Sequence, residues 1–253
     1  MKRRCILFLY AILLVSYFCA VPLNGQHKDG PYDYPIKPGT TKWNLLRTES
    51  ERREACLIPD SILYTMSTPD LFESCLDYPL LYGYYIFNFA QEGFNLTVTT
   101  FNGLQELLKR KDIGSVCLLK YINLNFDSIQ NGERGRIKVD YVHMLLAQDS
   151  IINKLTRSES IRLLREVYKK SELPRSIRDS QAEIQIIGAT SGYQLALMGR
   201  ILIKENYKPF VKQLSVDKHL QSDILWIGIG ASECSKQVLP YVEQFLSEVS
   251  DSN

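Results

Sequence analysis

The stretch Ser67–Pro79, STPDLFESCLDYP, contains the start, the buried face and the end of one helix. Ser67 supplies a hydroxyl at the N-cap position, and Pro69 stands in the first turn, where a helix needs no amide donor. The apolar side chains that follow share one helical face: Leu71, Phe72, Cys75 and Leu76. Because Pro79 disfavours helical backbone at Tyr78, the helix ends there. The stretch predicts a short helix that buries one side.

Similar patterns recur along the chain and predict a helical fold. Helices are expected around residues 102–108, 142–155, 158–168, 193–203 and 238–249. We expect Ser158 to cap the third of these helices and Gly188–Gly192 to form a loop before the fourth. Phe94–Phe101 alternates like a strand but lies between helical patterns, and Ile224–Ile229 fits a strand or a buried helix. We predict an all-α fold, either an irregular multi-helix bundle or an α-solenoid-like array of about ten short antiparallel helices.

The N-terminus has the form of a secretory signal peptide. Three basic residues, Lys2 to Arg4, precede the apolar run Cys5–Val21, and Pro22 and Gly25 follow it. This order predicts a signal peptide over residues 1–25, with cleavage after Gly25. A retained membrane anchor is the alternative, because the apolar run approaches the ~20 residues of a spanning helix. The mature protein is then expected in the periplasm, at the outer surface or outside the cell, with membrane contact only through an uncleaved signal segment.

Composition divides the rest of the chain. Residues 26–43 are rich in Gly, Pro and charge and predict an extended arm, whose end docks through Trp43, Leu45 and Leu46. Residues 44–253 form the expected helical domain, with a candidate loose boundary at 171–180. Without the signal peptide the chain has 27 basic and 28 acidic residues. This near-neutral balance argues against a nucleic-acid partner, which usually requires a basic surface.

Four cysteines remain after cleavage: Cys56, Cys75, Cys117 and Cys234. An exported protein can form disulfides, and four cysteines allow three complete pairings. Cys56 and Cys75 are close enough in sequence to lie on neighbouring predicted helices, so theirs is the pairing expected if a bridge forms. The alternative is that all four are small buried apolar residues.

The sequence contains few residues for metal or nucleophilic chemistry. Asp140 and His143 lie one helical turn apart, which is more typical of a local hydrogen bond than of a metal site. A thiol nucleophile would require Cys117 or Cys234 beside His143 or His219, and no protease signature surrounds either cysteine. We therefore expect no catalytic residue, no metal and no cofactor.

Seven aromatic rings lie within Cys75–Phe94. A helix over residues 78–90 would place four of them on one face, which predicts a buried position for Tyr78, Tyr82, Tyr85 and Phe89. The remaining candidates for contact with a ligand are two rings off that face and two nearby acids: Tyr84, Phe87, Asp77 and Glu92.

Five short motifs lie between residues 37 and 112: PGT–W at Pro38–Trp43, AC–IP at Ala55–Pro59, ST–DL at Ser67–Leu71, CL–YPL at Cys75–Leu80 and FNGL–ELL–R at Phe101–Arg110. With these motifs the segment resembles a group of uncharacterised exported bacterial proteins. The resemblance implies a bacterial, exported origin and one folded unit through residue 112. It implies no activity.

Together these features favour a non-catalytic binding or scaffold module of the bacterial cell envelope, with a protein or peptide partner. One alternative is a hydrolase of envelope polymers or peptides, which would use the unassigned Cys, His and acidic residues. The other is a carbohydrate-binding module, which would use the aromatic segment without chemistry.

Overall fold

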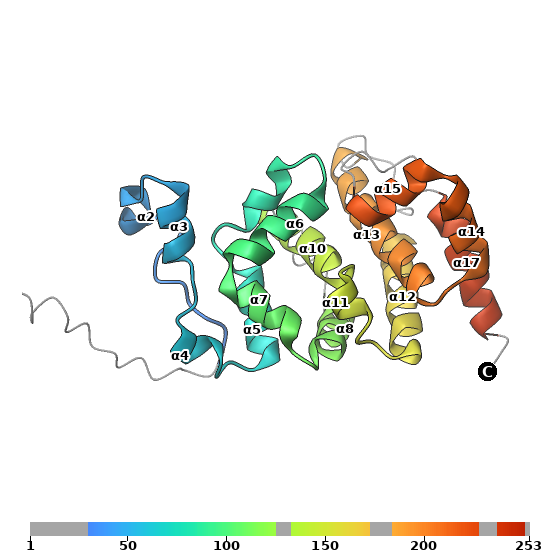
Figure 1. Cartoon of the computed structure of the whole chain (residues 1–253), viewed down its shortest axis with the longest axis horizontal. Helices are drawn as coiled ribbons and strands as arrows, with labels where there is room; N and C mark the ends of the chain where they lie inside the picture. Colours follow the sequence, from blue (N-terminus) through green and yellow to red (C-terminus); the bar gives the residue numbers. More distant parts are fainter. Residues whose placement is uncertain (1–29, 125–132, 173–183, 228–236, 251–253) are drawn as a thin grey trace, which may run out of the picture. The chain divides into compact units, whose positions relative to one another are not determined.

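Helices provide all the regular structure of the computed structural model, which describes residues 30–124, 133–172, 184–227 and 237–250. Those ranges contain fourteen α-helices and one 3-10 helix, and no strand (Figure 1). The predicted all-α multi-helix fold is therefore confirmed. The count exceeds ten because several helices are very short, such as α4 (Asp60–Leu63) and α11 (Asp149–Ile152). Pro31–Asn253 belong to one compact unit.

The helix predicted within Ser67–Pro79 forms as expected. It is α5 (Thr68–Leu76), and the Ser67 hydroxyl oxygen accepts a hydrogen bond from the Asp70 amide. Asp77 is the C-cap, and the predicted apolar face is buried. Local capping and one-sided burial therefore fix this helix together.

The predicted arm is held against α5 through Tyr34. The Tyr34 side chain is buried, and its hydroxyl donates to the Ser74 carbonyl at 2.9 Å. The Tyr32 amide donates to the Ser74 hydroxyl at 2.8 Å. Docking by Trp43, Leu45 and Leu46 is only partly realised: Trp43 of α2 (Thr41–Leu45) and Leu46 are half-buried, whereas Leu45 is exposed.

Other predictions lie outside the described residues. These are the signal peptide at 1–25 and nearly all of the candidate boundary at 171–180. Among the helices that the structure does describe, none combines the length and the apolar character of a membrane span.

The prediction of one helix over residues 78–90 is wrong. The segment forms the 3-10 helix η1 (Leu81–Ile86), extended backbone at Phe87 and Phe89, and then α6 (Ala90–Thr100). A 3-10 helix has three residues per turn, so residues that would share one face of an α-helix do not share a face here. Tyr78 is buried as predicted, whereas Tyr82 is 42% exposed and Phe89 is 36% exposed.

The strand-like segment Phe94–Phe101 is helical up to its last residue. Its threonines bond within α6: the Thr97 hydroxyl donates to the Gly93 carbonyl at 2.9 Å, and the Thr100 hydroxyl to the Leu96 carbonyl at 2.8 Å. Burial of the α6 face outweighs the strand preference of the β-branched residues. The predicted short helix follows as α7 (Asn102–Lys109).

After α7, the described part of the chain contains seven longer helices: α8 (Ile113–Asn123), α10 (Glu133–Leu146), α12 (Arg157–Glu172), α13 (Ile184–Lys204), α14 (Lys208–Val216), α15 (Lys218–Trp226) and α17 (Val238–Ser250). The apolar pattern of α17 is confirmed. The ambiguous Ile224–Ile229 segment is helical through Trp226, within the residues described.

Three boundaries differ from the sequence prediction. The expected helix over 142–155 is divided between α10 and α11. Thr156, rather than Ser158, caps α12: the Glu159 amide donates to the Thr156 hydroxyl at 3.2 Å, and the Thr156 amide donates to the Glu159 carboxylate at 2.9 Å. This reciprocal pair is a capping box. Gly188–Gly192 is not a loop, because α13 runs through it.

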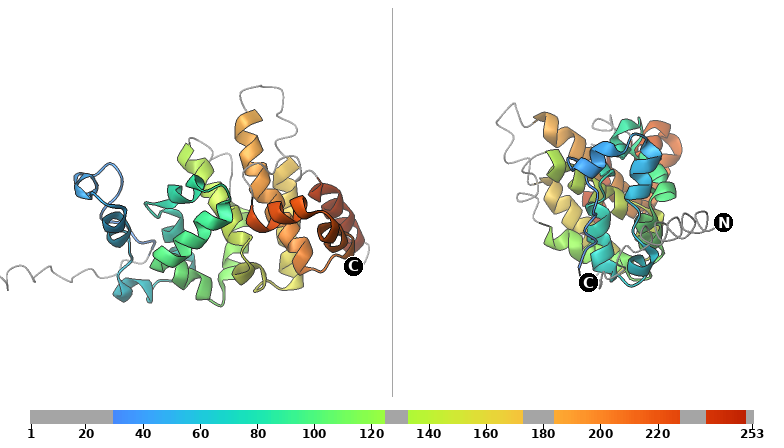
Figure 2. Two further views of the ribbon diagram at one scale, coloured as in Figure 1. Left: turned by 45° about the horizontal axis from the view of Figure 1, so that its top comes forward. Right: turned by 90° about the vertical axis from the view of Figure 1, so that its left-hand side faces the viewer.

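Helix α13 is the element against which most of the second half packs. It contacts α10, α12, α15 and α17, and α15 crosses it closely (Figures 1 and 2). Gly199 permits that crossing, since a Cβ at this position would lie 2.7 Å from Cδ1 of Ile224.

Arg200, one residue further along α13, is a buried cation at the meeting point of several helix ends. Its Nε donates to the Ile224 carbonyl at 3.1 Å and its Nη2 to the Leu225 carbonyl, both at the end of α15. Its Nη1 donates to the Ala147 carbonyl at 2.8 Å, just after α10. The last carbonyls of a helix lack hydrogen-bond donors within the helix, and the negative end of the helix dipole lies there. A guanidinium supplies the missing donors and its positive charge interacts favourably with the dipole.

The same guanidinium reaches α6. Arg200 Nη2 donates to Gln91 Oε1 at 2.9 Å, and Gln91 Nε2 donates to Gln148 Oε1 at 2.9 Å. Burial lowers the pKa of the Arg200 guanidinium, and Asp149 partly offsets the effect. An arginine remains charged even so, and its partners here are dipoles rather than a contacting carboxylate.

We expect the Gly199→Ala substitution to lower the free energy of unfolding by about 1–2 kcal/mol, because overpacking outweighs the better helix propensity of alanine. Adding Ile224→Val removes the methyl group that clashes. In urea denaturation, the double-mutant cycle should show a favourable coupling of at least about 0.5 kcal/mol.

Gly83→Ala is the matched control, because a Cβ at Gly83 meets nothing within 4 Å. It should change stability by less than about 0.5 kcal/mol. Equal effects of the two alanines, or strict additivity with Ile224→Val, would contradict the close crossing of α13 and α15.

Candidate functional site

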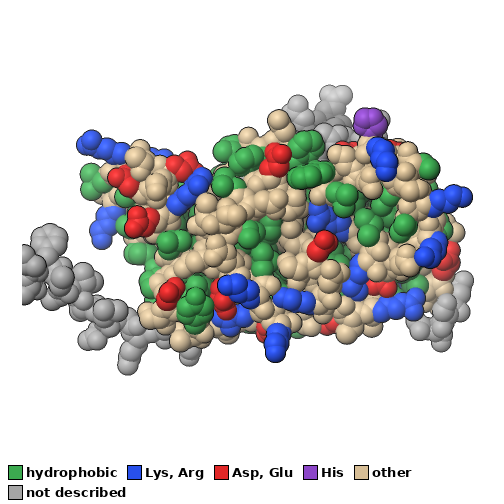
Figure 3. Space-filling model, viewed as in Figure 1, with side chains coloured by type: hydrophobic (Ala, Val, Ile, Leu, Met, Phe, Trp, Pro, Cys, Tyr) green, Lys and Arg blue, Asp and Glu red, His purple; other side chains and the backbone are tan. Residues whose placement is uncertain are grey.

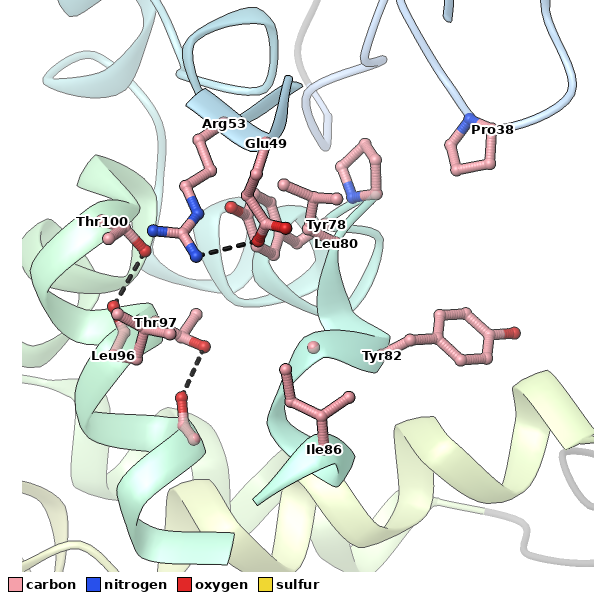
Figure 4. Close-up of a pocket in the computed structure, with 13 residues that line it drawn as sticks. Pro38, Glu49, Arg53, Tyr78, Leu80, Tyr82, Ile86, Leu96, Thr97 and Thr100 are labelled. Carbon is pink, nitrogen blue, oxygen red and sulfur yellow. Dashed lines mark hydrogen bonds and ion pairs between the residues drawn. The ribbon is translucent and has the colours of Figure 1, made fainter. Parts of the chain in front are cut away.

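A groove of about 380 Å³ lies between η1 and α6 (Figure 4). Tyr82 and Ile86 line it from η1, and Leu96 and Thr97 line it from α6. Glu49 and Arg53 of α3 (Glu49–Ala55) line the third side of the groove. Three segments that are separate in the sequence therefore meet at this groove.

The wall behind the groove is well supported. Tyr78 lines it, and the Tyr78 ring stacks on Phe101 with centroids 4.1 Å apart and an angle of 16° between the planes. Tyr34 packs against both rings, with centroids 6.4 Å and 6.5 Å away. Because stacked aromatic rings fix one another's orientation, this side is pre-formed.

The charge of the groove is concentrated at α3. Arg53 Nη2 donates to Glu49 Oε1 at 2.8 Å, one helical turn apart on α3. The Glu49 side chain is 68% exposed and the Arg53 side chain 31% exposed. Figure 4 shows the guanidinium pointing from α3 into the groove, near Tyr78 and Thr100. Exposed helical pairs of this kind contribute only about 0.3–0.5 kcal/mol.

Both charges are close enough to affect the Tyr78 phenol. Burial is the main cause that raises the pKa of Tyr78, while Arg53 lowers this pKa and Glu49 raises it. The hydroxyls of Thr97 and Thr100 donate to backbone carbonyls inside α6. Among the described lining residues, Glu49 and Arg53 alone carry charge.

The residues that the sequence suggested for ligand contact lie elsewhere. Asp77 forms an ion pair with Lys138 of α10, Glu92 is exposed, and Phe87 is half-buried; none of the three lines the groove. The Tyr84 side chain lies outside the described part of the chain. Sequence reasoning missed Tyr82, because the expected helix placed it in the core.

A second apolar patch occurs where α6 begins and α15 ends. Phe89, Leu225 and Trp226 are exposed there, and the Phe89 and Trp226 rings lie 6.3 Å apart. Figure 3 shows hydrophobic side chains over α6 and α15 on this face.

His143, a candidate metal ligand or base in the sequence, is buried inside the helical unit. His143 Nε2 lies 3.2 Å from the Tyr121 hydroxyl. Burial, with a smaller contribution from Lys170, lowers the pKa of His143 to about 3, so the ring is neutral at pH 7. Asp140 is also buried. In the described ranges, no three His, Cys, Asp or Glu side chains gather in a way that could hold a metal ion.

The structure does not contain a Cys56–Cys75 disulfide, the pairing that the sequence suggested if any bridge formed. Cys56, Cys75 and Cys117 are free buried thiols, as in the alternative interpretation, and Cys234 lies outside the described residues. Burial raises the pKa of Cys56 to about 11 and raises the pKa of Cys75 and Cys117 as well. Since the thiolate is the reactive form, these three are poor nucleophiles at neutral pH.

No family model matches the chain, and no curated protein or solved structure is significantly similar to it. The candidate site therefore depends on the geometry of this chain alone.

We expect the three described thiols to resist modification in the native protein. The test uses the mature protein, residues 26–253, with the substitution Cys234→Ser. At pH 8 no thiol of the native protein should react rapidly with a disulfide reagent, because this pH lies well below the raised pKa of Cys56. After denaturation without reductant, three thiols should react: Cys56, Cys75 and Cys117. A single thiol after denaturation would instead reveal the Cys56–Cys75 bridge.

Proposed function

We propose that this chain is an exported, non-catalytic binding module of the bacterial cell envelope, and that it holds an apolar segment of a partner protein in the groove between η1 and α6. The observation that carries the proposal is the exposure of Tyr82 and Ile86 along a pre-formed wall. The signal-peptide pattern of residues 1–25 supports export.

Apolar anchors on a fixed wall favour binding. The Ile86 side chain is 79% exposed, and covering such surface gains roughly 25 cal/mol per Å². Binding energy usually concentrates in a few aromatic and apolar residues that fill pockets. The groove volume of about 380 Å³ falls within the range of about 300–1,000 Å³ typical of ligand pockets.

The lining offers less support for hydrolysis. The described thiols and His143 are buried away from the groove surface. Glycoside cleavage needs two carboxyl groups across the bond, and Glu49 is the one acid among the described lining residues. Its carboxylate is already paired with Arg53. Binding without chemistry is therefore the function that we favour over the hydrolase alternative.

Thr97→Phe should fill the groove and abolish binding. The test selects random displayed dodecapeptides on the mature protein, and then measures the Kd of the enriched peptides for each variant. We expect apolar peptides to be enriched and Thr97→Phe to weaken them at least tenfold, which corresponds to about 1.4 kcal/mol.

Thr99→Phe is the matched control, because Thr99 is exposed on the same helix and does not line the groove. It makes a comparable internal bond, from its hydroxyl to the Leu96 carbonyl at 2.8 Å. Equal binding by both variants would place the peptide elsewhere. A glycan array that gave Thr97-dependent binding where peptides gave none would favour the carbohydrate-binding alternative.

A further inference from the structure

We propose that the groove receives the C-terminus of its partner, with the terminal carboxylate on Arg53 and the last apolar side chains between η1 and α6. This inference depends on the proposed function and adds the chemical class of the ligand. It is carried by the position of the Arg53 guanidinium, which together with its partner Glu49 is the charged part of a mainly apolar lining among the described residues.

The Arg53 guanidinium has hydrogen-bonding capacity that its partner Glu49 does not use. A guanidinium carries five N–H donors in a planar fork that matches a carboxylate. Within the described residues, the recorded hydrogen bond of this guanidinium is the one from Nη2 to Glu49. The remaining donors are available to a ligand on the groove side, where Figure 4 shows the group pointing.

The shape of the groove distinguishes its two ends. In Figure 4 the α3 side chains lie across one end, while Ile86 lies toward the other. Tyr78 and Leu80 line the side near α3. A peptide that enters from the Ile86 end meets α3, so the group that reaches Arg53 is the end of its chain. This geometry favours a terminal carboxylate over an acidic side chain within a continuing chain.

Glu49 is the partner of Arg53 in the unbound protein. Its carboxylate occupies Arg53 from the same helix and is mostly exposed to solvent. An exposed pair of this spacing is weak and readily exchanged, whereas a bidentate arginine–carboxylate pair is among the stronger polar contacts. Glu49 therefore acts as an internal competitor that the partner carboxylate displaces.

The test compares three labelled hexapeptide pools by fluorescence anisotropy. In the first, the last three positions are randomised over Ala, Val, Leu, Ile and Phe, and the C-terminus is a free acid. The second pool is the same with a C-terminal amide. The third ends in an amide and contains one Glu at the last position. We expect the free acid pool to bind at least tenfold more tightly than the other two.

Two substitutions on α3 should act in opposite directions. Arg53→Gln should remove the preference of the protein for the acid over the amide. Glu49→Gln should tighten acid binding by about twofold, because the competing carboxylate is gone. Arg47→Gln is the matched control, since it removes one exposed arginine just before α3 and does not line the groove. Thermal unfolding must be unchanged in the variants compared.

The outcomes separate this inference from the proposed function. Equal, Thr97-dependent binding of acid and amide pools would overturn the C-terminal inference and leave the groove as a peptide site. Binding of the Glu pool as tight as the free acid would overturn it too, in favour of an internal carboxylate. The absence of Thr97-dependent binding in all three pools would contradict the proposed function itself.

Discussion

Arg200 is the constraint on which the packing of α6, α10 and α15 around α13 depends. Its guanidinium donates hydrogen bonds to the carbonyl of Ala147, just after α10, and to the carbonyl of Ile224 near the end of α15. It also donates to Gln91 at the start of α6. Removing such a partner would leave buried acceptors unsatisfied, at a cost of about 1–3 kcal/mol for each. Because α6 is also one wall of the groove, the buried cation on α13 positions a surface that it does not touch.

The elements that could be predicted are those whose signals are local. Ser67 and Pro69 specify α5 within a few residues, and the apolar stripe of α17 depends on nothing outside that helix. The all-α class follows from the repetition of such signals. The start of α12 is also specified locally, since Thr156 has Glu159 three residues later and forms a capping box, whereas Ser158 has Ile161 at that position.

The rest depends on contacts that a single sequence does not display. Arg200 resembles any surface charge on a helix until the ends of α10 and α15 are brought to it. The candidate site was misplaced for a similar reason, since a 3-10 turn exposes Tyr82 where an α-helix would bury it. Arg53 is one of several arginines near the N-terminus, and only the fold places it beside Tyr78.

Hydrogen exchange on Arg200→Met tests this constraint most directly, since methionine keeps an apolar side chain in place and removes every donor. The predicted result is a joint loss of amide protection at the start of α6, the end of α10 and the end of α15, including the Ala90 amide that donates to the Ile227 carbonyl at 3.2 Å. Protection in α5 and α7 should persist. Loss confined to α13 and α15, with α6 and α10 unchanged, would contradict the role of Arg200 as their common anchor.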